Sequence, residues 1–498
     1  MLDAARTAAV DAVTQHAYSI LRQGSLDLEG YRDVVIGILA LKFLSDIQAP
    51  GWVQLGHGAD AAVPSPLRHL ELPTTVDFHA LLENSEMPGI GDRLDAAFHA
   101  LAAANRMHLD GIQGLRFSST RLGETKERDR TLGRLMAVIG HDSALDFRQA
   151  DASSFAAAAY ACDTLLTTMA GTLGKRGVEF FTPPAISRLM AELLEPRDGE
   201  SIMDPCCGTG GALIAGSQRA RQNGDDAGCE LYGQEINGET LALARLNMVL
   251  HNENRTYLAW GDVLQDPKFI APNNKLRTFD VVLSSPPYNV AGWQREAGNV
   301  DPLGRFWRGI PPATSANYAF ISHMVESMSM THGRMAVVMP MGALFRGGAE
   351  AQIRRKLLEE NLFDAVIALP AKLMPSTAIP VAILVLRRCK QDEKVLFIDG
   401  SNFFEYGKTQ NTLGPTNLQR IVQTYRQRQQ DTAYSRLVSL GDIADNEFNL
   451  NVGHYIQVQT QEEQVDLEAL RAERLKLQAQ LSELEMHLAV LRQDTAYG

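Results

Sequence analysis

The feature that most constrains the fold is a short strand, a glycine-rich turn and a helix in immediate succession. Residues 201–203 are an apolar strand, residues 204–211 form the turn, and residues 212–215 begin the helix. This order predicts the first unit of a nucleotide-binding α/β sheet, because glycines let a ligand approach the backbone closely. The turn matches neither the G-x-G-x-x-G fingerprint nor a Walker A loop, since no Gly-Lys-Ser/Thr follows it.

Acidic residues end this strand and the next two apolar runs. Asp204 ends the first, Glu235 follows residues 231–234, and Asp262 follows residues 256–261. In such sheets an acid after the second strand accepts hydrogen bonds from ribose hydroxyls. The third is placed to accept from an adenine amino group. Each acid alone is more often a solvated turn residue. Three in succession favour S-adenosylmethionine, which carries a sulfonium and an ammonium group and no phosphate.

A stiff loop follows the fourth apolar run, residues 279–283. It contains Ser285, Pro286, Pro287 and Tyr288. Prolines cannot donate to a sheet ladder and their φ is fixed, so the strand must stop here. Ligands of open α/β sheets sit at such strand ends. A polar residue, two prolines and a ring would clamp a flat ligand with a polar edge. Taken alone, this stretch fits a plain Pro-Pro turn with a packed tyrosine better than it fits a ligand clamp.

Three more apolar runs complete the expected sheet, at residues 334–339, 365–369 and 382–386. The last two are joined by a segment too short for a crossover helix, so they should pair antiparallel. The predicted fold is therefore α/β, with a seven-stranded S-adenosylmethionine-dependent methyltransferase (Rossmann-like) sheet. An N-terminal helical domain and a C-terminal helical, coiled-coil-like tail should flank it.

The flanking regions carry helical patterns. Residues 30–46 and 155–170 have the spacing and composition of helices. Thr182 before Pro183 predicts a helix start, with the threonine as N-cap. Thr416 is a possible N-cap for a helix over residues 417–428.

A leucine seam near the C-terminus follows heptad spacing. It consists of Leu467, Leu470, Leu477, Leu481, Leu484, Leu488 and Leu491. A helix packed on its own domain and a coiled coil with a partner both fit this pattern. We expect four parts: a helical domain (1–170), a catalytic domain (171–400), an extension (401–460) and a coiled-coil-like helix for partner contact (461–498).

Composition and net charge restrict the compartment and the binding partners that we expect for the protein. The 498-residue chain carries a net charge of −12, although a protein that grips DNA alone normally has a basic surplus. Either DNA is not the substrate, or a partner supplies much of the grip. Five cysteines without metal-ligand spacing predict a reducing cytoplasm and no metal site. We expect no membrane span and see no secretory signal.

Several runs together resemble the modification (M) subunit of type I restriction–modification systems, a DNA amino-methyltransferase family. They are YRDVVIGILALKFLSD (31–46), VEFFTPPAISRLM (178–190), DPCCGTGGAL (204–213), the run 341–386 that begins MGALFRGGAE, FIDGSNFFEYGKTQN (397–411) and NLNVGHYI (449–456).

The resemblance implies a cofactor pocket for S-adenosylmethionine and a catalytic loop. The cofactor residues would be Glu179, Phe180, Phe181, Thr182, Pro183, Pro184, Asp204, Gly208, Thr209, Gly210, Gly211, Glu235 and Asp262. The catalytic residues would be Ser285, Pro286, Pro287 and Tyr288, with no metal. Tyr288 would stack on a flipped base, while the Ser285 hydroxyl and the Pro286 carbonyl accept hydrogen bonds from its amino group.

The resemblance also implies partners: double-stranded DNA, one specificity (S) subunit, a second M subunit, and a restriction (R) subunit in the full complex. The S subunit would then supply much of the grip on DNA. The family usually has asparagine where Ser285 stands. The breadth of the match favours N6 of adenine as the target, whereas Ser-Pro-Pro-Tyr resembles the motif of N4-cytosine methyltransferases. A non-catalytic scaffold subunit is a further alternative.

Overall fold

The computed structural model describes residues 2–22, 28–47, 70–148, 152–170, 181–222, 228–294, 301–375, 378–388, 390–407, 410–456 and 474–486. Two compact units make up the chain, one ending at Ile456 and one beginning at Gln457. The sheet and the described helices up to residue 456 belong to the first unit. The second contributes a helix over residues 474–486.

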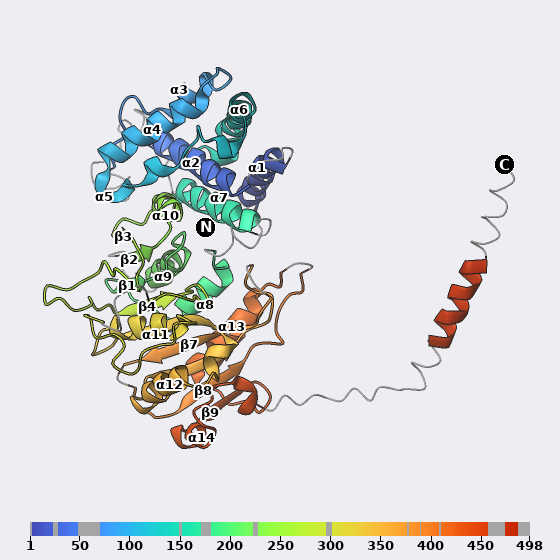
Figure 1. Ribbon diagram of the computed structural model, residues 1–498. Helices are drawn as coiled ribbons and strands as arrows, with labels where there is room; N and C mark the ends of the chain where they lie inside the picture. Colours follow the sequence, from blue (N-terminus) through green and yellow to red (C-terminus); the bar gives the residue numbers. More distant parts are fainter. Residues whose placement is uncertain are drawn as a thin grey trace. The chain divides into compact units, whose positions relative to one another are not determined.

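A mixed sheet with helices packed against it lies in the first unit (Figure 1). Within the described residues it has nine strands, in the order β3-β2-β1-β4-β5-β7-β6-β8-β9. The strands are β1 (Ser201–Asp204), β2 (Glu230–Glu235), β3 (Thr256–Trp260), β4 (Val281–Ser284), β5 (Arg334–Pro340), β6 (Phe363–Ala368), β7 (Val381–Arg387), β8 (Val395–Asp399) and β9 (Ser435–Val438). The first five strands are mutually parallel. The predicted antiparallel pairing of β6 with β7 is confirmed.

The expected count of seven strands is wrong, because β8 and β9 extend the sheet beyond β6. Both strands are short, at five and four residues. Length alone does not explain the omission, because β1 and β4 have four residues each and were predicted. In β9 only the first and last residues are buried, so it lacks a continuous apolar run.

Helices cover both faces of the sheet, because successive strand residues point to opposite sides. Ile202 faces a cluster that includes α8, α9 and α13. Met203 faces a cluster that includes α11 and α12. The helices of this part are α8 (Pro184–Leu194), α9 (Gly211–Arg221), α10 (Gly238–Leu250), α11 (Asn317–Glu326), α12 (Ala349–Glu359), α13 (Pro415–Gln427) and α14 (Leu440–Asp445), with the 3₁₀ turns η5 (Met341–Leu344) and η6 (Val452–His454).

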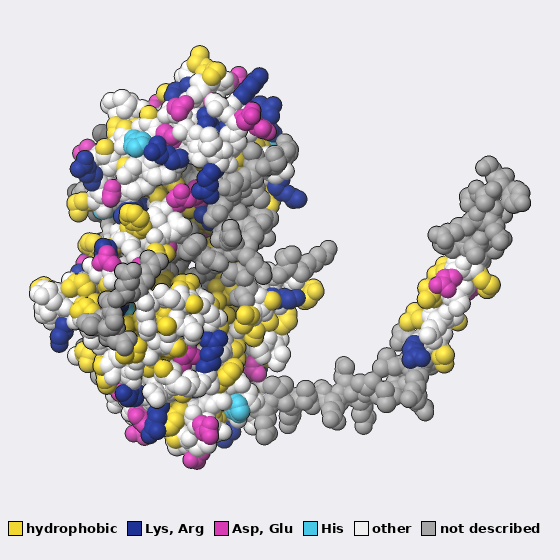
Figure 2. Space-filling view, viewed as in Figure 1, with side chains coloured by type: hydrophobic (Ala, Val, Ile, Leu, Met, Phe, Trp, Pro, Cys, Tyr) yellow, Lys and Arg dark blue, Asp and Glu magenta, His cyan; other side chains and the backbone are white. Residues whose placement is uncertain are grey.

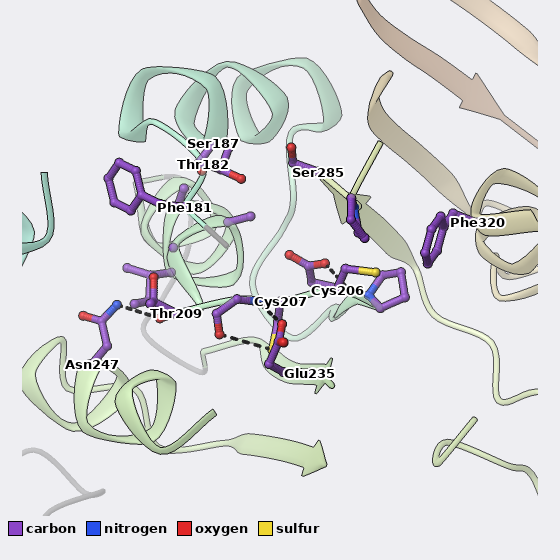
Figure 3. A pocket seen from close by; sticks show the side chains of 18 of the residues that line it. Phe181, Thr182, Ser187, Cys206, Cys207, Thr209, Glu235, Asn247, Ser285 and Phe320 are labelled. Atoms are coloured by element: carbon purple, nitrogen blue, oxygen red, sulfur yellow. Dashed lines mark hydrogen bonds between the residues drawn. The ribbon is translucent and has the colours of Figure 1, made fainter. Parts of the chain in front are cut away.

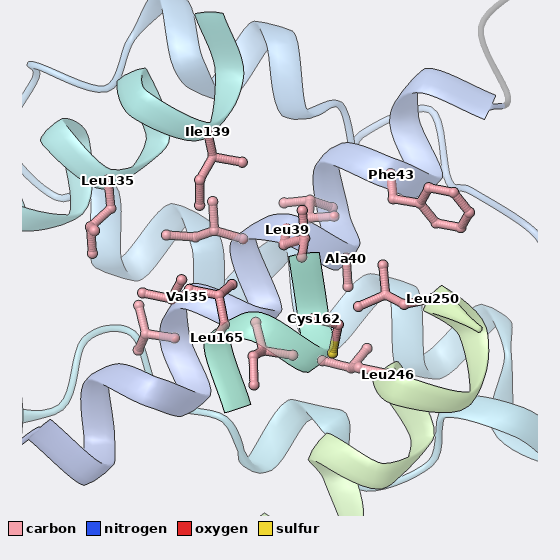
Figure 4. Packing of buried hydrophobic residues seen from close by; sticks show 14 of the residues in the cluster. Val35, Leu39, Ala40, Phe43, Leu135, Ile139, Cys162, Leu165, Leu246 and Leu250 are labelled. Carbon is pink, nitrogen blue, oxygen red and sulfur yellow. The ribbon is translucent and has the colours of Figure 1, made fainter. Parts of the chain in front are cut away.

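The N-terminal part is helical, and the helices expected at residues 30–46 and 155–170 are α2 and α7. Its elements are α1 (Ala4–Arg22), α2 (Leu28–Ile47), α3 (Phe78–Glu83), α4 (Ile90–Ala104), α5 (Arg106–Leu109), α6 (Thr125–His141) and α7 (Ala152–Ala170), with η2 (Ile112–Gly114), η3 (Thr120–Leu122) and η4 (Ser143–Leu145). Leu246 and Leu250 of α10 lie in the same core as Cys162 of α7 and Ala40 of α2 (Figure 4). The helical part is thus packed on the sheet domain through α10.

Two predicted helix starts are wrong by one or two residues. Pro183, and not Thr182, caps α8, and Pro184 is the first helical residue. A residue before proline is held out of the helical region, so Pro183 cannot begin the helix. Likewise Gly414, and not Thr416, precedes α13, because Pro415 takes the first helical position.

The helix over residues 474–486 carries three leucines of the predicted seam. Leu477, Leu481 and Leu484 are exposed on it. The seam residues Leu467, Leu470, Leu488 and Leu491 lie outside the described residues. In the part of the chain that the structure describes, no helix has the length and apolar character to cross a membrane.

Candidate active site

A cavity of about 510 Å³ lies at the carboxyl ends of β1, β2 and β4. In the strand order, β1 and β4 are neighbours, and the chain leaves them toward opposite edges of the sheet. This topological switch point is where open α/β sheets bind ligands. Figure 3 shows Asn247 and Thr209 toward one side of the cavity, Phe320 toward the other, and Glu235 between them.

Asp204 is buried at the end of β1, where two donors hold its carboxylate. Its Oδ1 accepts from the Ser284 hydroxyl at 2.6 Å and from the Cys206 N–H at 3.0 Å. Burial raises the pKa of Asp204 to about 7, against the lowering effect of these two hydrogen bonds. The bond from Ser284 links the glycine-rich turn to the start of the acceptor loop, which we define as Ser285–Asn289.

Glu235 lies at the end of β2 and accepts a hydrogen bond from the same glycine-rich turn. Its carboxylate accepts from the Gly208 N–H at 3.0 Å and the Asn237 N–H at 2.8 Å. Burial raises its pKa, while these backbone donors lower it. Asp262 lines the cavity as well and accepts from the Leu264 N–H at 2.9 Å. All three strand-ending acids line this cavity.

The glycines of the turn have different environments. Gly208 and Gly211 line the cavity, whereas Gly210 does not. Gly210 has φ +84°, and a Cβ there would lie 2.5 Å from the Met248 Cε on α10. Position 210 therefore needs a residue that adopts a left-handed backbone and has no Cβ, and glycine meets both conditions.

The acceptor loop borders the same cavity with part of its residues. Ser285 and Pro287 line the cavity, whereas Pro286 and Tyr288 do not. Tyr288 packs against the apolar cluster of α8, α9 and α13, and its hydroxyl lies 3.4 Å from the Ser285 Oγ. Burial raises the pKa of Tyr288 to about 12. Stacking of this ring on a base stays a prediction.

The remaining predicted residues fall into three groups. Phe181, Thr182, Pro184 and Thr209 line the cavity. Pro183 caps α8 and does not line it. Glu179 and Phe180 lie outside the described residues.

Some cavity residues escaped the sequence prediction. Phe320 comes from α11 and brings an aromatic ring opposite the acids. No local motif marks it, since its place depends on how α11 packs. Ile236 lines the cavity while 57% exposed, and its position directly after Glu235 was an available signal. Asn247, inside α10, donates to the Thr209 carbonyl at 2.8 Å and so fixes the turn.

Comparison with solved structures defines the class of this fold as an α/β methyltransferase. The type I restriction-modification system methyltransferase subunit from Streptococcus thermophilus has a TM-score of 0.74 and 25% identity, covering 91% of this chain and 99% of that chain. A modification subunit of a putative type I restriction enzyme from Vibrio vulnificus has a TM-score of 0.59 at 17% identity, covering 88% and 93%, which shows the fold alone.

Sequence comparison gives the family. The N-6 DNA Methylase model matches residues 157–464, and the HsdM N-terminal domain matches residues 12–139. The chain therefore belongs to the N-6 DNA methylase family, and the resemblance to type I modification subunits is confirmed. The MjaVIII methylase subunit of Methanocaldococcus jannaschii is 34% identical over 63% of this chain and 55% of its own. The MpnII methylase subunit of Mycoplasma pneumoniae is 31% identical over 71% and 66%. The matches span about half to two thirds of the length of these relatives.

Proposed function

We propose that this chain is the methyl-transferring subunit of a type I restriction–modification complex. It would take the methyl group from S-adenosylmethionine and place it on the exocyclic amino group of a DNA base. The observation that carries the proposal is one cavity that holds Asp204 and Glu235 together with Ser285 of the acceptor loop. The two acids proposed to bind the cofactor and the serine proposed to accept a hydrogen bond from the base amino group then line the same cavity.

The residues present fit the cofactor. Asp204 and Glu235 are buried carboxylates whose hydrogen-bond partners are neutral donors, so a cationic ligand would compensate their charge. We assign Glu235 to the ribose hydroxyls and Asp262 to the adenine amino group. Ile236 and Phe320 supply apolar surface for the purine ring. When bound, S-adenosylmethionine supplies a methyl group activated by its sulfonium.

The acceptor loop would prepare the base. An exocyclic amino group is a poor nucleophile, because its lone pair is delocalised into the ring. The base must also leave the helix to reach the cavity. Hydrogen bonds from the amino group to the Ser285 hydroxyl and the Pro286 carbonyl would localise the lone pair. Tyr288 would stack on the base, which requires the ring to leave its packed position. Positioning then provides the rate enhancement.

The target base has two candidates. Membership in the N-6 DNA methylase family favours N6 of adenine. Ser285 before Pro-Pro-Tyr resembles the motif of N4-cytosine methyltransferases and so favours N4 of cytosine. A serine hydroxyl reaches less far than an asparagine amide and can also donate. The test is mass detection of nucleosides from DNA treated with this chain, its specificity partner and cofactor. N6-methyladenine supports the first assignment and N4-methylcytosine the second. Cofactor binding without any methyl transfer would leave only the scaffold function.

We propose the partners that the resemblance implies: double-stranded DNA, an S subunit, a second M subunit and an R subunit. On the face shown in Figure 2, Lys and Arg side chains are interspersed with Asp and Glu. With a net charge of −12, this supports an S subunit that provides much of the grip on DNA. The exposed leucines of the helix over 474–486 would contact a partner helix. We propose the same four-part domain division as above. Residues 401–460 contribute the strand β9 to the sheet.

A further inference from the structure

The acceptor loop is held from outside the cavity at its last residue, Asn289. This residue follows Tyr288 directly and has a left-handed φ of +54°. Its N–H donates to the Asn317 Oδ1 at 3.0 Å. Its own Oδ1 accepts from the Arg346 Nη1 at 2.9 Å and from the Asn317 Nδ2 at 3.3 Å. An arginine is thereby attached to the loop whose neighbouring residues, Pro287 and Val290, line the cavity.

The side chain of Arg346 remains 42% exposed in this position. A guanidinium has five N–H donors in a planar fork, and one of them is given to Asn289. In the described part of the chain, the acid nearest to this group is Glu350, with 4.0 Å between Nη1 and Oε1. The planar fork matches the oxygens of a phosphate group. Arg346 thus retains donors beside the acceptor loop.

The backbone that carries Arg346 is rigidly supported. The buried guanidinium of Arg354 donates to the carbonyl oxygen of Arg346 at 3.1 Å and to that of Phe448 at 2.8 Å. The Tyr318 hydroxyl donates to the Ala343 carbonyl at 2.8 Å, within the same turn. A ligand contact made by Arg346 would therefore require little further ordering of the chain.

Open space adjoins the arginine on its C-terminal side. A Cβ placed on Gly347 or Gly348 would meet nothing within 4 Å. In contrast, a Cβ on Gly342 would approach the Arg346 Nε to 2.9 Å, so the side chain lies close against that glycine. The arginine is confined on the side of Gly342, and the space next to Gly347 and Gly348 is open.

We propose that Arg346 binds a backbone phosphate of the DNA strand that carries the flipped base. The inference rests on the proposed function, because a base held by the acceptor loop brings its flanking phosphates close to that loop. Phosphate contacts fix the position of the strand without reading its sequence. On a chain with a net charge of −12, a cation fixed to the acceptor loop would hold the strand where the chemistry occurs.

The test uses the complex of this chain with its specificity partner. DNA affinity is measured from 50 to 200 mM salt for wild type and Arg346→Ala. Each phosphate contact contributes about 0.9 to the slope of log K against log [salt], so wild type should lose roughly 3.5-fold more affinity over this range. The difference should appear on specific DNA, where the target base can enter the cavity, and should be absent on non-specific DNA. Arg346→Lys, which keeps the charge, should retain the wild-type slope.

The matched control is Arg355→Ala. Arg355 has a 60% exposed side chain and pairs with Glu359 at 2.7 Å within α12, so its removal should leave the slope unchanged. Cofactor affinity should be equal in all variants, which shows that the cavity is intact. If Arg346→Ala is poorly folded, Arg346→Gln replaces it.

Two results would overturn the inference. One is an unchanged salt slope in folded Arg346→Ala or Arg346→Gln. The other is an equal reduction of the slope on non-specific DNA, in which no base enters the cavity, because Arg346 would then be a general backbone contact. A wild-type complex that transfers no methyl group to DNA instead refutes the proposed function. A methylating wild type with an unaffected variant refutes only the role of Arg346.

Discussion

Two adjacent glycines at the start of α9 have separable roles, and alanine at each position tests them. Gly210 has φ +84°, and a Cβ there would lie 2.5 Å from Cε of Met248 and 3.8 Å from Cβ of Ala244. Gly211 is the first residue of α9, and an added Cβ would meet no protein atom within 4 Å. Gly211 also lines the cavity. Gly210→Ala should therefore affect stability, and Gly211→Ala should affect binding.

The magnitude for Gly210→Ala has two parts. A left-handed backbone costs an L-residue about 1–2 kcal/mol. The overlap with Met248 costs about 1–3 kcal/mol, of which the flexible methionine relieves part. We expect a loss of about 2–4 kcal/mol in the free energy of unfolding. For Gly211→Ala we expect a change within about 0.5 kcal/mol, because the site is open and helical.

The assay combines urea unfolding of the full chain, followed by circular dichroism, with calorimetric titration of S-adenosylmethionine. Gly210→Ala should lower the urea midpoint at an unchanged slope. Gly211→Ala should keep the midpoint and bind cofactor about tenfold more weakly, a difference of about 1.4 kcal/mol, because its methyl group enters the cavity. Equal midpoints for Gly210→Ala and wild type, or an equal drop for both variants, would refute this division of roles.

Three further variants test the site and the core. Ser284→Ala removes a donor that lowers the pKa of Asp204, so that pKa should rise above about 7. Cofactor affinity, measured from pH 6 to 9, should then reach half its maximum at a higher pH than in wild type. Identical profiles would argue against a role for ionised Asp204. Tyr288→Ala should reduce turnover more than cofactor affinity in a methyl-transfer assay, while Tyr288→Phe keeps the ring and most of the turnover; full activity of the alanine variant would exclude stacking. Leu246→Ala, at a fully buried contact between α10 and the helical part, should lower the free energy of unfolding by about 2–5 kcal/mol in urea denaturation, and a change below 1 kcal/mol would contradict that packing.

Local patterns account for the parts of the fold that could be predicted. Apolar runs that end in Asp204 and Glu235 identify strands and their carboxyl ends, because burial on both faces demands continuous apolar residues. The run before Asp262 is the edge strand β3, which has no fully buried residue. The same reasoning placed the acceptor loop after β4. It missed β8 and β9, whose few residues take their place in the sheet from neighbouring strands and not from their own periodicity.

Contacts distant in sequence account for what prediction missed at the site. Phe320 reaches the cavity from α11, and Asn247 fixes the turn from α10. Neither side chain belongs to a local sequence motif, because the residues that each one contacts at the site lie far away along the chain. Pro183 shows a different error: the effect of Pro184 on its neighbour outweighed the capping preference of Thr182.

The sequence by itself determined the class of sheet, the order of strand-ending acids and the family of this protein. These depend on residue types at short spacing, which burial and backbone geometry restrict strongly. Only the tertiary structure decided that Ser284 holds Asp204, that Gly210 faces Met248, and that Tyr288 packs against the core with its hydroxyl near Ser285. Each of these depends on which elements lie side by side, and that arrangement follows from packing of the whole chain rather than from any single segment.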